Sequence, residues 1–418
     1  MRETRNLEFK QSVSKTFLKT VSAFANYGTG RILFGVDDAG KSIGLEKPIN
    51  DALHIENMIN DSLDPVPRYT VDVDESAKTI CLTVFEGEAK PFFCARSAYR
   101  RADSSTVEVD RVELGRLFLA GQNRTFDELP SDQKNLSFSL LAERFVTHLG
   151  MTAFDDNSLR ALGLIAPDGR YTNAGEILSD SNSLAGVDIV KFGRNVNEFL
   201  ERKVVVGKSV LEQYDAALEM YDRYCTYEVM RGATRETVER VPFEAFRETV
   251  ANALVHRTWD VDANVTISMS DDSVAVVSPG ALPIGVSVDE YLGGGISIPR
   301  NPIVANAFFR LDYIERFGTG VTRINEAYKD SVEKPSFEVR SNSLAVTLPF
   351  ISDTPVRLSK DESLVLSAMS RNLLLARSDI ERVTGFSKDK TIRVLNRLMA
   401  YGLVTKEGSG RNRKYCMR

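Results

Sequence analysis

One nine-residue stretch, from Glu248 to His256, constrains the fold of this chain more than any other feature. In a helix, at about 100° per residue, Glu248, Asn252 and His256 recur every four residues and share one edge. Apolar side chains fall on the opposite side: Phe243, Phe246, Val250, Ala253 and Leu254. A carboxylate, an amide oxygen and an imidazole along one edge can hold a hydrated Mg²⁺ and orient a water, as nucleotide-hydrolysing sites require. Taken alone, the pattern also fits an amphipathic helix whose polar face is merely solvated.

A glycine-rich turn, Gly318-Thr319-Gly320, stands directly before another predicted helix, which begins near Gly320. Two glycines there leave backbone N–H groups free to approach a phosphate, and the helix dipole favours the anion. A lone turn of this kind is weak evidence. After the helix at 243–257 and the strands predicted at 264–269 and 273–277, it indicates a phosphate site. Between them, Ser278-Pro279-Gly280 interrupts a strand where a nucleotide base can pack.

The order of these motifs resembles the GHKL ATPase fold of gyrase and MutL-type proteins. It is more similar still to the GHKL-like family described as RecG-like helicase C-terminal. The resemblance covers about residues 190–350 and is carried by Glu248-x-x-x-Asn252-Ala-x-x-His256-Arg257, Ser278-Pro-Gly280, Pro299-Arg-Asn-Pro302 and Glu315-Arg-x-Gly318-Thr-Gly320.

The resemblance implies ATP and Mg²⁺ as cofactors. Asn252 would ligate the metal, Glu248 would orient the attacking water as the catalytic residue, and Gly318 and Gly320 would contact phosphates. The implied nucleotide-binding set is completed by His256, Gly280 and Thr319. Where GHKL enzymes carry the Asp-x-Gly that reads adenine, this chain has Ser278-Pro-Gly280.

A second group of polar residues lies near the N-terminus, at Glu3, Glu8 and Lys10. Two carboxylates and a lysine beside the first predicted helix could bind a divalent ion next to a phosphodiester. The simpler interpretation is that acids are favoured near a helix start, because of the helix dipole.

Five ordered motifs resemble the Schlafen AlbA-type domain over about residues 1–118: Glu8-Phe-Lys10, Ala23-Phe-Ala-Asn26, Ile32-Leu-Phe-Gly-Val-Asp-Asp38, Gly44-Leu45 and Tyr99-Arg-Arg101-Ala-Asp-Ser-Ser-Thr106. The resemblance implies binding of nucleic acid, as RNA or single-stranded DNA, with Arg101 facing the backbone. In the animal Schlafen branch, two glutamates at this spacing and a third acid cut RNA. Glu3 and Glu8 match that pair, with Glu8 as a metal ligand and Lys10 beside it. The candidates for the third acid are Asp37, Asp38 and Glu46.

The C-terminal region is basic, although the whole chain has a net charge of −5. Residues 351–418 contain 14 Lys and Arg against 7 Asp and Glu. A basic segment attached to an acidic body is typical of a nucleic-acid reader joined to a sensor.

The pattern of residues 359–418 predicts a winged helix-turn-helix. A short helix at Asp379–Val383 is followed by a turn at Gly385 and a helix capped by Ser387. Basic residues share one face of that helix, and apolar residues the opposite one: Lys390, Arg393 and Arg397 against Ile392, Leu395 and Met399. A basic hairpin with Arg411, Arg413 and Lys414 follows. A recognition helix and a basic wing predict binding of double-stranded DNA, and a protein-binding winged helix is the alternative.

Together these features predict a multidomain α/β (α+β) protein. The predicted units are a Schlafen AlbA-type domain at 1–119, a helical connector at 120–185, a GHKL-like sandwich at 186–350 and a winged helix at 359–418. Without a membrane-length apolar run or a cysteine framework, we expect a cytoplasmic protein with no membrane partner. A homodimer is the default expectation.

The favoured function is a DNA-binding, ATP-responsive transcriptional regulator. The alternative is a metal-dependent nuclease that uses Glu3 and Glu8 and is gated by the GHKL-like domain. A third hypothesis is a scaffold with a degenerate nucleotide pocket.

Overall fold

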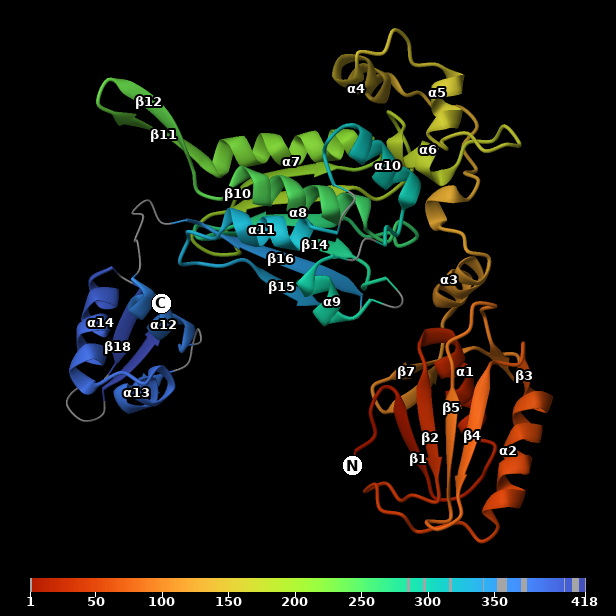
Figure 1. Ribbon diagram of the computed structural model, residues 1–418. Coiled ribbons are helices and arrows are strands. Elements are labelled where there is room, and N and C mark those ends of the chain that lie inside the picture. The colour runs from red at the N-terminus through yellow and green to blue at the C-terminus, as the bar shows by residue number, and fades with distance from the viewer. Residues whose placement is uncertain are drawn as a thin grey trace.

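Three bodies make up the protein in the computed structural model: an N-terminal domain, a central body and a C-terminal unit (Figure 1). The structure describes residues 2–283, 286–295, 298–315, 318–340, 342–351, 359–369, 374–401, 403–407 and 413–417. The mixture of helices and sheets confirms the predicted α/β class.

The N-terminal domain is a four-stranded sheet, in the order β1-β2-β5-β4, with helices packed on it. Its elements are β1 Leu7–Lys10, α1 Phe17–Tyr27, β2 Gly30–Phe34, α2 Pro48–Ser62, β3 Leu63–Asp64, β4 Tyr69–Asp74, β5 Thr79–Val84, β6 Phe93–Cys94, β7 Tyr99–Ala102, β8 Ser105–Glu108 and α3 Arg111–Gly121. Strand β5 alternates buried and half-buried residues, as a strand with one face on a core does. Helix α1 lies between the sheet and the β7–β8 ribbon, and it buries Phe17, Val21 and Phe24.

The central body is a six-stranded sheet, in the order β10-β9-β13-β14-β16-β15, with helices α7, α8 and α11 in front of it (Figure 1). Its helices are α7 Val210–Tyr224, α8 Phe243–Val255, α9 Val288–Gly293, α10 Pro302–Arg310 and α11 Gly320–Ala327. Its strands are β9 Val187–Phe192, β10 Phe199–Val205, β13 Val265–Met269, β14 Ser273–Pro279, β15 Ser336–Val339 and β16 Ser343–Pro349. A separate hairpin, β11 Thr226–Arg231 and β12 Thr234–Glu239, projects from this body (Figure 1).

The segment before this sheet contributes to the same hydrophobic core. It contains η1 Phe126–Glu128, α4 Ser139–Leu149, α5 Asp156–Ala161 and α6 Asn173–Leu178. Leu141, Phe145 and Ile177 belong to one buried cluster with Ile189 and Phe246 of the central body. The connecting segment therefore folds as part of the central body.

One ion pair ties the N-terminal domain to the central body, and one buried carboxylate ties the connecting segment to α10. Arg116 on α3 makes a two-pronged ion pair with Asp260, with N···O distances of 3.0 and 3.1 Å. Asp127 is fully buried and accepts hydrogen bonds from the backbone N–H groups of Ile303 and Val304, at 2.8 and 3.2 Å. Asp127 thus caps the start of α10, and burial raises the pKa of this carboxyl to about 6.

The C-terminal unit has a small core of its own around Val365, Ile380 and Leu395. Its elements are α12 Lys360–Ser367, β17 Leu375–Ala376, α13 Arg377–Thr384, α14 Lys388–Ala400, β18 Val404–Glu407 and β19 Lys414–Met417, with the strand order β17-β19-β18. Gly385 ends α13 in the left-handed conformation, and the Ser387 side chain caps α14, as the sequence predicts. The winged helix-turn-helix stays a prediction for this unit.

Candidate functional site

The first candidate site lies where α8 faces the beginning of α11. Asn252 donates a hydrogen bond from Nδ2 to Glu248 Oε1, at 2.9 Å. A Cβ atom added at Gly320 would lie 2.7 Å from both of these atoms. The four-residue repeat on α8 and the glycine turn that follows much later in the chain are thus brought together, as the sequence predicts. Only glycine allows this close approach, because any side chain there would displace the Glu248–Asn252 pair.

Glu248 is buried, with an exposed fraction of 2%, and is therefore not on a solvated face. Its second oxygen, Oε2, has no hydrogen-bond partner among the described residues. Burial raises the pKa of this carboxyl, while Asn252, Arg323 and Arg247 act in the opposite direction. An unsatisfied buried oxygen beside a helix N-terminus is suited to hold a water or a hydrated cation.

His256 is the C-cap residue of α8, and its backbone N–H still donates to the Asn252 carbonyl, at 2.9 Å. Its place on one reactive edge with Glu248 and Asn252 stays a prediction. Burial, with a smaller effect from Arg300, lowers the pKa of His256 to about 4. The imidazole is therefore neutral near pH 7. Phe243, predicted on the buried side of α8, is 38% exposed at the first turn.

The Ser278-Pro279-Gly280 motif packs against the end of α8. Ser278 donates from its hydroxyl to the Ala253 carbonyl, at 2.8 Å, so this side chain is engaged within the protein. Gly280 has φ +118°, and a Cβ there would collide with Thr258. Arg300 donates to the Thr258 hydroxyl on the same side. Gly280 thus permits tight packing of the strand end on the residues that follow α8.

Two glycines that follow the end of α9, Gly294 and Gly295, lie against the predicted phosphate turn. The N–H of Gly295 donates to the Gly318 carbonyl, at 3.1 Å. A Cβ added at Gly294 would lie 2.9 Å from Thr322 Oγ1 on α11. Thr319 is the N-cap residue of α11, without a side-chain cap. Because no side chain of the described residues caps the helix there, the first backbone N–H groups of α11 are available to an anion.

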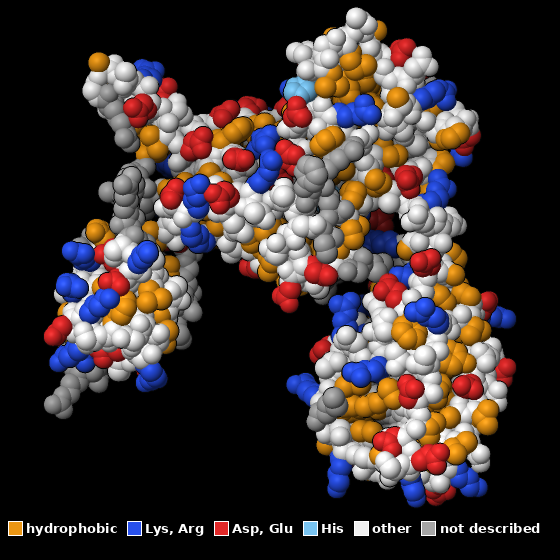
Figure 2. All heavy atoms as spheres, in the orientation of Figure 1, with side chains coloured by type: hydrophobic (Ala, Val, Ile, Leu, Met, Phe, Trp, Pro, Cys, Tyr) orange, Lys and Arg blue, Asp and Glu red, His pale blue; other side chains and the backbone are white. Residues whose placement is uncertain are grey.

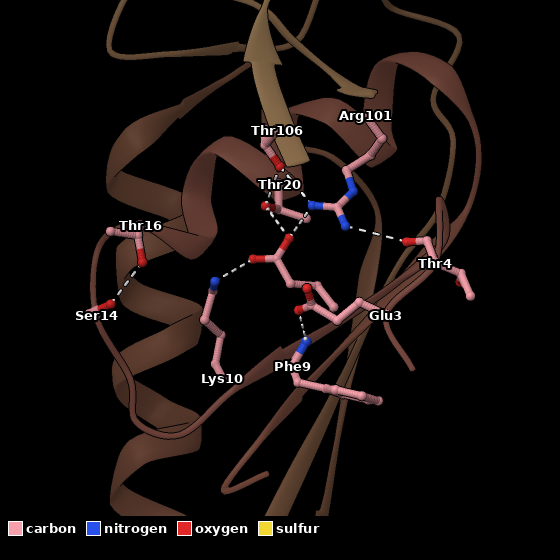
Figure 3. Close-up of polar contacts among 10 residues, drawn as sticks. Glu3, Thr4, Phe9, Lys10, Ser14, Thr16, Thr20, Arg101 and Thr106 are labelled. Carbon is pink, nitrogen blue, oxygen red and sulfur yellow. Dashed lines mark hydrogen bonds and ion pairs between the residues drawn. The ribbon is translucent and has the colours of Figure 1, made fainter. Parts of the chain in front are cut away.

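The second candidate site, in the N-terminal domain, is a buried ionic network around Glu8 (Figure 3). Glu8 pairs with Lys10 at 2.6 Å through Oε1, and with Arg101 through Oε2. The same Oε2 accepts a hydrogen bond from Thr20, at 2.7 Å. Arg101 also donates to Thr106 Oγ1, at 2.9 Å. Strand β1, helix α1 and the β7–β8 ribbon are therefore joined through one carboxylate.

This geometry corrects two sequence predictions. Arg101 does not face outward toward a nucleic-acid backbone, because it is only 7% exposed and its charge is compensated by Glu8. Glu8 is not an open metal ligand, because both of its oxygens already contact cations. Glu3 accepts a hydrogen bond from the Phe9 backbone N–H, at 2.8 Å.

The candidate third acids do not complete a metal site either. Asp37 accepts from the backbone N–H groups of Ala39 and Lys41, at 3.0 and 2.8 Å, and so stabilises a turn. Within the described part of the chain, no group of three or more His, Cys, Asp or Glu side chains could hold a metal ion.

The third candidate site is the exposed face of α14 in the C-terminal unit. Lys390 pairs with Asp361 at 2.8 Å, and Arg397 lies 3.7 Å from Glu362, so both contact α12. Arg393 is exposed. An open depression of about 450 Å³ is lined by Asp389, Ile392, Arg393, Asn396 and Arg397. Ile392 therefore shares the basic face, contrary to the prediction that it lies on the opposite side with Leu395 and Met399.

Basic side chains also gather elsewhere on this unit (Figure 2). Arg413 and Lys414 are exposed at the start of β19, where the predicted wing returns to the sheet. Arg411 lies outside the described residues.

Three arginines near the first site were not singled out from the sequence. Arg323 pairs with Glu315 at 2.9 Å and lies on α11, one turn after Gly320. Arg247 donates to the Asp312 carbonyl, at 3.0 Å. Arg300 stands in the Pro299–Pro302 motif beside Asn301, which donates to the carbonyls of Val255 and Arg257, at 2.7 and 2.9 Å. The Pro299–Pro302 motif in the sequence could have pointed to Arg300. In the structure, its Asn301 connects the start of α10 to the end of α8.

Comparisons with known families agree with two parts of this architecture. Residues 3–110 match the family described as Schlafen, AlbA_2. Residues 262–348 match the family described as putative ATP-dependent DNA helicase recG C-terminal. One chain thus carries a segment similar to a Schlafen AlbA_2 domain and a later segment similar to a recG C-terminal domain.

Two solved structures are similar to the chain. The DIP2311 protein from Corynebacterium diphtheriae is 18% identical, with a TM-score of 0.49, over 99% of this chain and 95% of that one. The N-terminal domain of a putative ATP-dependent DNA helicase RecG-related protein from Nitrosomonas europaea is 25% identical, with a TM-score of 0.19, over 25% of this chain and 80% of that one. No curated protein matches. None of the helices in the described residues is long and apolar enough to span a membrane.

Proposed function

We propose that this protein, which joins a Schlafen AlbA_2 domain to a recG C-terminal-type domain, is an ATP-responsive, DNA-binding regulator of transcription. In this proposal, Mg·ATP binds between α8 and α11, and the C-terminal unit binds double-stranded DNA as a winged helix. The protein acts as a homodimer in the cytoplasm.

The observation that carries the nucleotide site is the approach of Gly320 to Asn252 and Glu248. A Cβ at Gly320 would lie 2.7 Å from Asn252 Nδ2 and Glu248 Oε1, so the backbone at the start of α11 lies directly against a carboxylate and an amide. Because Asn252 uses Nδ2 toward Glu248, its Oδ1 atom is left for a cation. The N–H groups of Thr319 and Gly320 would meet phosphate oxygens, and the bound Mg²⁺ would neutralise phosphate charge.

Glu248 is the residue that would orient a water, since its Oε2 is buried without a partner in the described structure. Ser278 stands where GHKL enzymes carry the aspartate that reads adenine, but it has a hydroxyl in place of a carboxylate, and that hydroxyl donates to the Ala253 carbonyl on α8. We accordingly propose that the site responds to the triphosphate more than to the base.

The DNA-binding role is supported by the exposed Arg393 and Asn396 on α14 and by Arg413 and Lys414 near the start of β19. Arginine and asparagine are the side chains that most often read guanine and adenine in the major groove. The metal-dependent nuclease hypothesis is less favoured, because Glu8 is neutralised by Arg101 and Lys10. We propose instead that the N-terminal domain contacts single-stranded DNA or RNA through exposed lysines near α1, Lys15 and Lys19.

Calorimetry of the full chain with Mg·ATP tests the nucleotide site. Asn252→Ala should weaken binding by about 1–3 kcal/mol, the cost of stranding a polar partner, which is about 5- to 150-fold in Kd. Asn396→Ala is the matched control, because this exposed asparagine lies on α14 in the C-terminal unit and takes no part in the α8–α11 site. If the wild type binds no nucleotide, the proposed sensor function is wrong and the scaffold hypothesis is favoured.

A further inference from the structure

Strand β10 is an uncovered edge of the central sheet. Within the described residues it pairs with β9 alone, so its outer row of backbone N–H and C=O groups faces away from the sheet. Three of its apolar side chains are largely exposed: Phe199 at 59%, Leu200 at 56% and Val204 at 51%. An exposed edge strand with apolar side chains is a template for another strand, and proteins usually protect such edges with charges, proline or a β-bulge. The irregularity in the β10–β9 register lies between Phe199 and Glu201, at one end of the strand, and the pairing from Glu201 to Val205 is regular.

The charged residues in the middle of β10 do not protect this edge, because each is already paired within the chain. Arg202 forms a two-pronged pair with Asp188 on β9, at 3.0 and 2.6 Å. Lys203 pairs with Glu219 on α7. Glu201 pairs with Arg223 and accepts a hydrogen bond from the Tyr224 hydroxyl, at 2.5 Å. Among the described residues, these three charges of the edge are therefore all compensated and do not repel a second strand.

The sequence of β10 is complementary to itself when it is read antiparallel about Arg202. In that register, Glu201 lies opposite Lys203 of a second copy, and Leu200 lies opposite Val204. Each of these pairs occurs twice, because a two-fold axis repeats every contact. The two Arg202 side chains meet at the axis, where each is neutralised by Asp188 of its own chain. Opposite charges and apolar pairs that lie directly across two strands stabilise their pairing.

We propose that β10 is the surface through which two copies of this chain associate, by antiparallel β10–β10 pairing centred on Arg202. The two six-stranded sheets then form one continuous sheet across the two-fold axis. This inference rests on the homodimer of the proposed function and names its surface. A second copy is favoured over an unrelated strand, because the charge and apolar pattern of β10 complements its own reverse.

The test is the mass of the full chain by light scattering, over a range of concentrations. We expect the wild type to reach twice the chain mass of 46.5 kDa. Val204→Lys should shift the dimer dissociation constant upward by at least about tenfold, since it places a lysine opposite Leu200. Val383→Lys is the matched control, because Val383 is 68% exposed on α13, away from any sheet edge, and this variant should retain the wild-type mass. Circular dichroism melting of both variants verifies that they fold.

The register has its own test. A Leu200→Cys, Val204→Cys double variant should be joined into a covalent dimer by a short thiol–thiol reagent, at a yield well above that of the wild-type chain. A wild-type chain that stays at the single-chain mass overturns homodimer formation itself, while leaving nucleotide and DNA binding by each copy testable. A dimer that persists in Val204→Lys, or that fails to crosslink, overturns only the β10 surface.

Discussion

The substitution Gly320→Ala adds one methyl group at the point where α11 meets α8. The added Cβ would lie 2.7 Å from Asn252 Nδ2 and 2.7 Å from Glu248 Oε1, well inside van der Waals contact. Gly320 is the first residue of α11 and does not have a positive φ, so alanine fits its backbone without strain. The substitution therefore acts on the site and not on the conformation of the helix.

The size of the effect follows from what must move. To make room, Glu248 or Asn252 must give up their 2.9 Å hydrogen bond or shift away from the start of α11. Breaking one buried hydrogen bond costs about 1–3 kcal/mol. Alanine in a helix offsets part of this cost in stability, by about 0.5–1 kcal/mol relative to glycine. We therefore expect a small change in folding stability and a reduction in Mg·ATP affinity of about 5- to 150-fold.

Calorimetric titration with Mg·ATP measures the affinity, and urea denaturation measures the stability. Gly115→Ala is the control, since Gly115 is also helical, within α3, and a Cβ there would meet nothing within 4 Å. It should stabilise the chain slightly and leave the affinity unchanged. If Gly320→Ala binds Mg·ATP as tightly as the wild type, the phosphates do not bind at the start of α11.

Other predictions concern the remaining sites. The pKa of His256 is lowered from 6.5 to about 4. Its neutral form therefore stabilises the fold fully above pH 6.5, and up to about 3 kcal/mol of this stability disappears as the pH falls toward 4. His256→Gln should remove that slope from the pH dependence of urea denaturation, and a variant curve parallel to wild type would contradict this. Asp127, whose pKa is raised to about 6, changes the stability in the opposite direction, because its stabilising effect is lost as the pH rises. This contribution is the same in the wild type and in His256→Gln, so the difference between the two curves reports His256. Glu8→Gln should cost about 3–5 kcal/mol, since it leaves Arg101 buried and unpaired. Glu3→Gln should cost far less stability. The nuclease hypothesis has a separate test, which is cleavage of labelled tRNA with Mg²⁺ or Mn²⁺. Cleavage that is abolished in Glu8→Gln but kept in an equally destabilised variant would restore that hypothesis. In gel-shift titrations, replacing Lys390, Arg393 and Arg397 together should remove sequence preference. Replacing Arg413 and Lys414 should weaken binding to all duplexes alike, and each phosphate that is no longer neutralised should lower the salt slope by about one unit. Unchanged duplex binding after deletion of residues 355–418 would refute this location.

Helical periodicity was sufficient to predict that Glu248 and Asn252 share one edge of α8. The glycine turn that meets them was predicted separately, from two glycines before a helix. Which way the His256 ring points depends on the packing at the helix end, which periodicity does not encode. For Arg101 the sequence did contain a signal. In a strand every second residue shares a face, so Arg101 is expected on the same side as Tyr99. The structure shows both residues buried on β7. The Arg116–Asp260 contact, between residues 144 positions apart, depends on how two separately folded parts meet, which no local pattern encodes.

The cap that Asp127 provides for α10 determines where this chain can be divided. A fragment starting at residue 186 would lack Asp127 and leave the N–H groups of Ile303 and Val304 without their acceptor. It would also expose the core surface that Leu141, Phe145 and Ile177 cover.

The family-matched segment, residues 262–348, is shorter still and lacks α8 itself. The piece that can be expressed alone, exchanged between proteins or left intact by a protease therefore begins ahead of Thr125, the residue whose hydroxyl donates to Asp127 at 2.6 Å. A recombination event that preserves the central body must carry this short upstream segment with it.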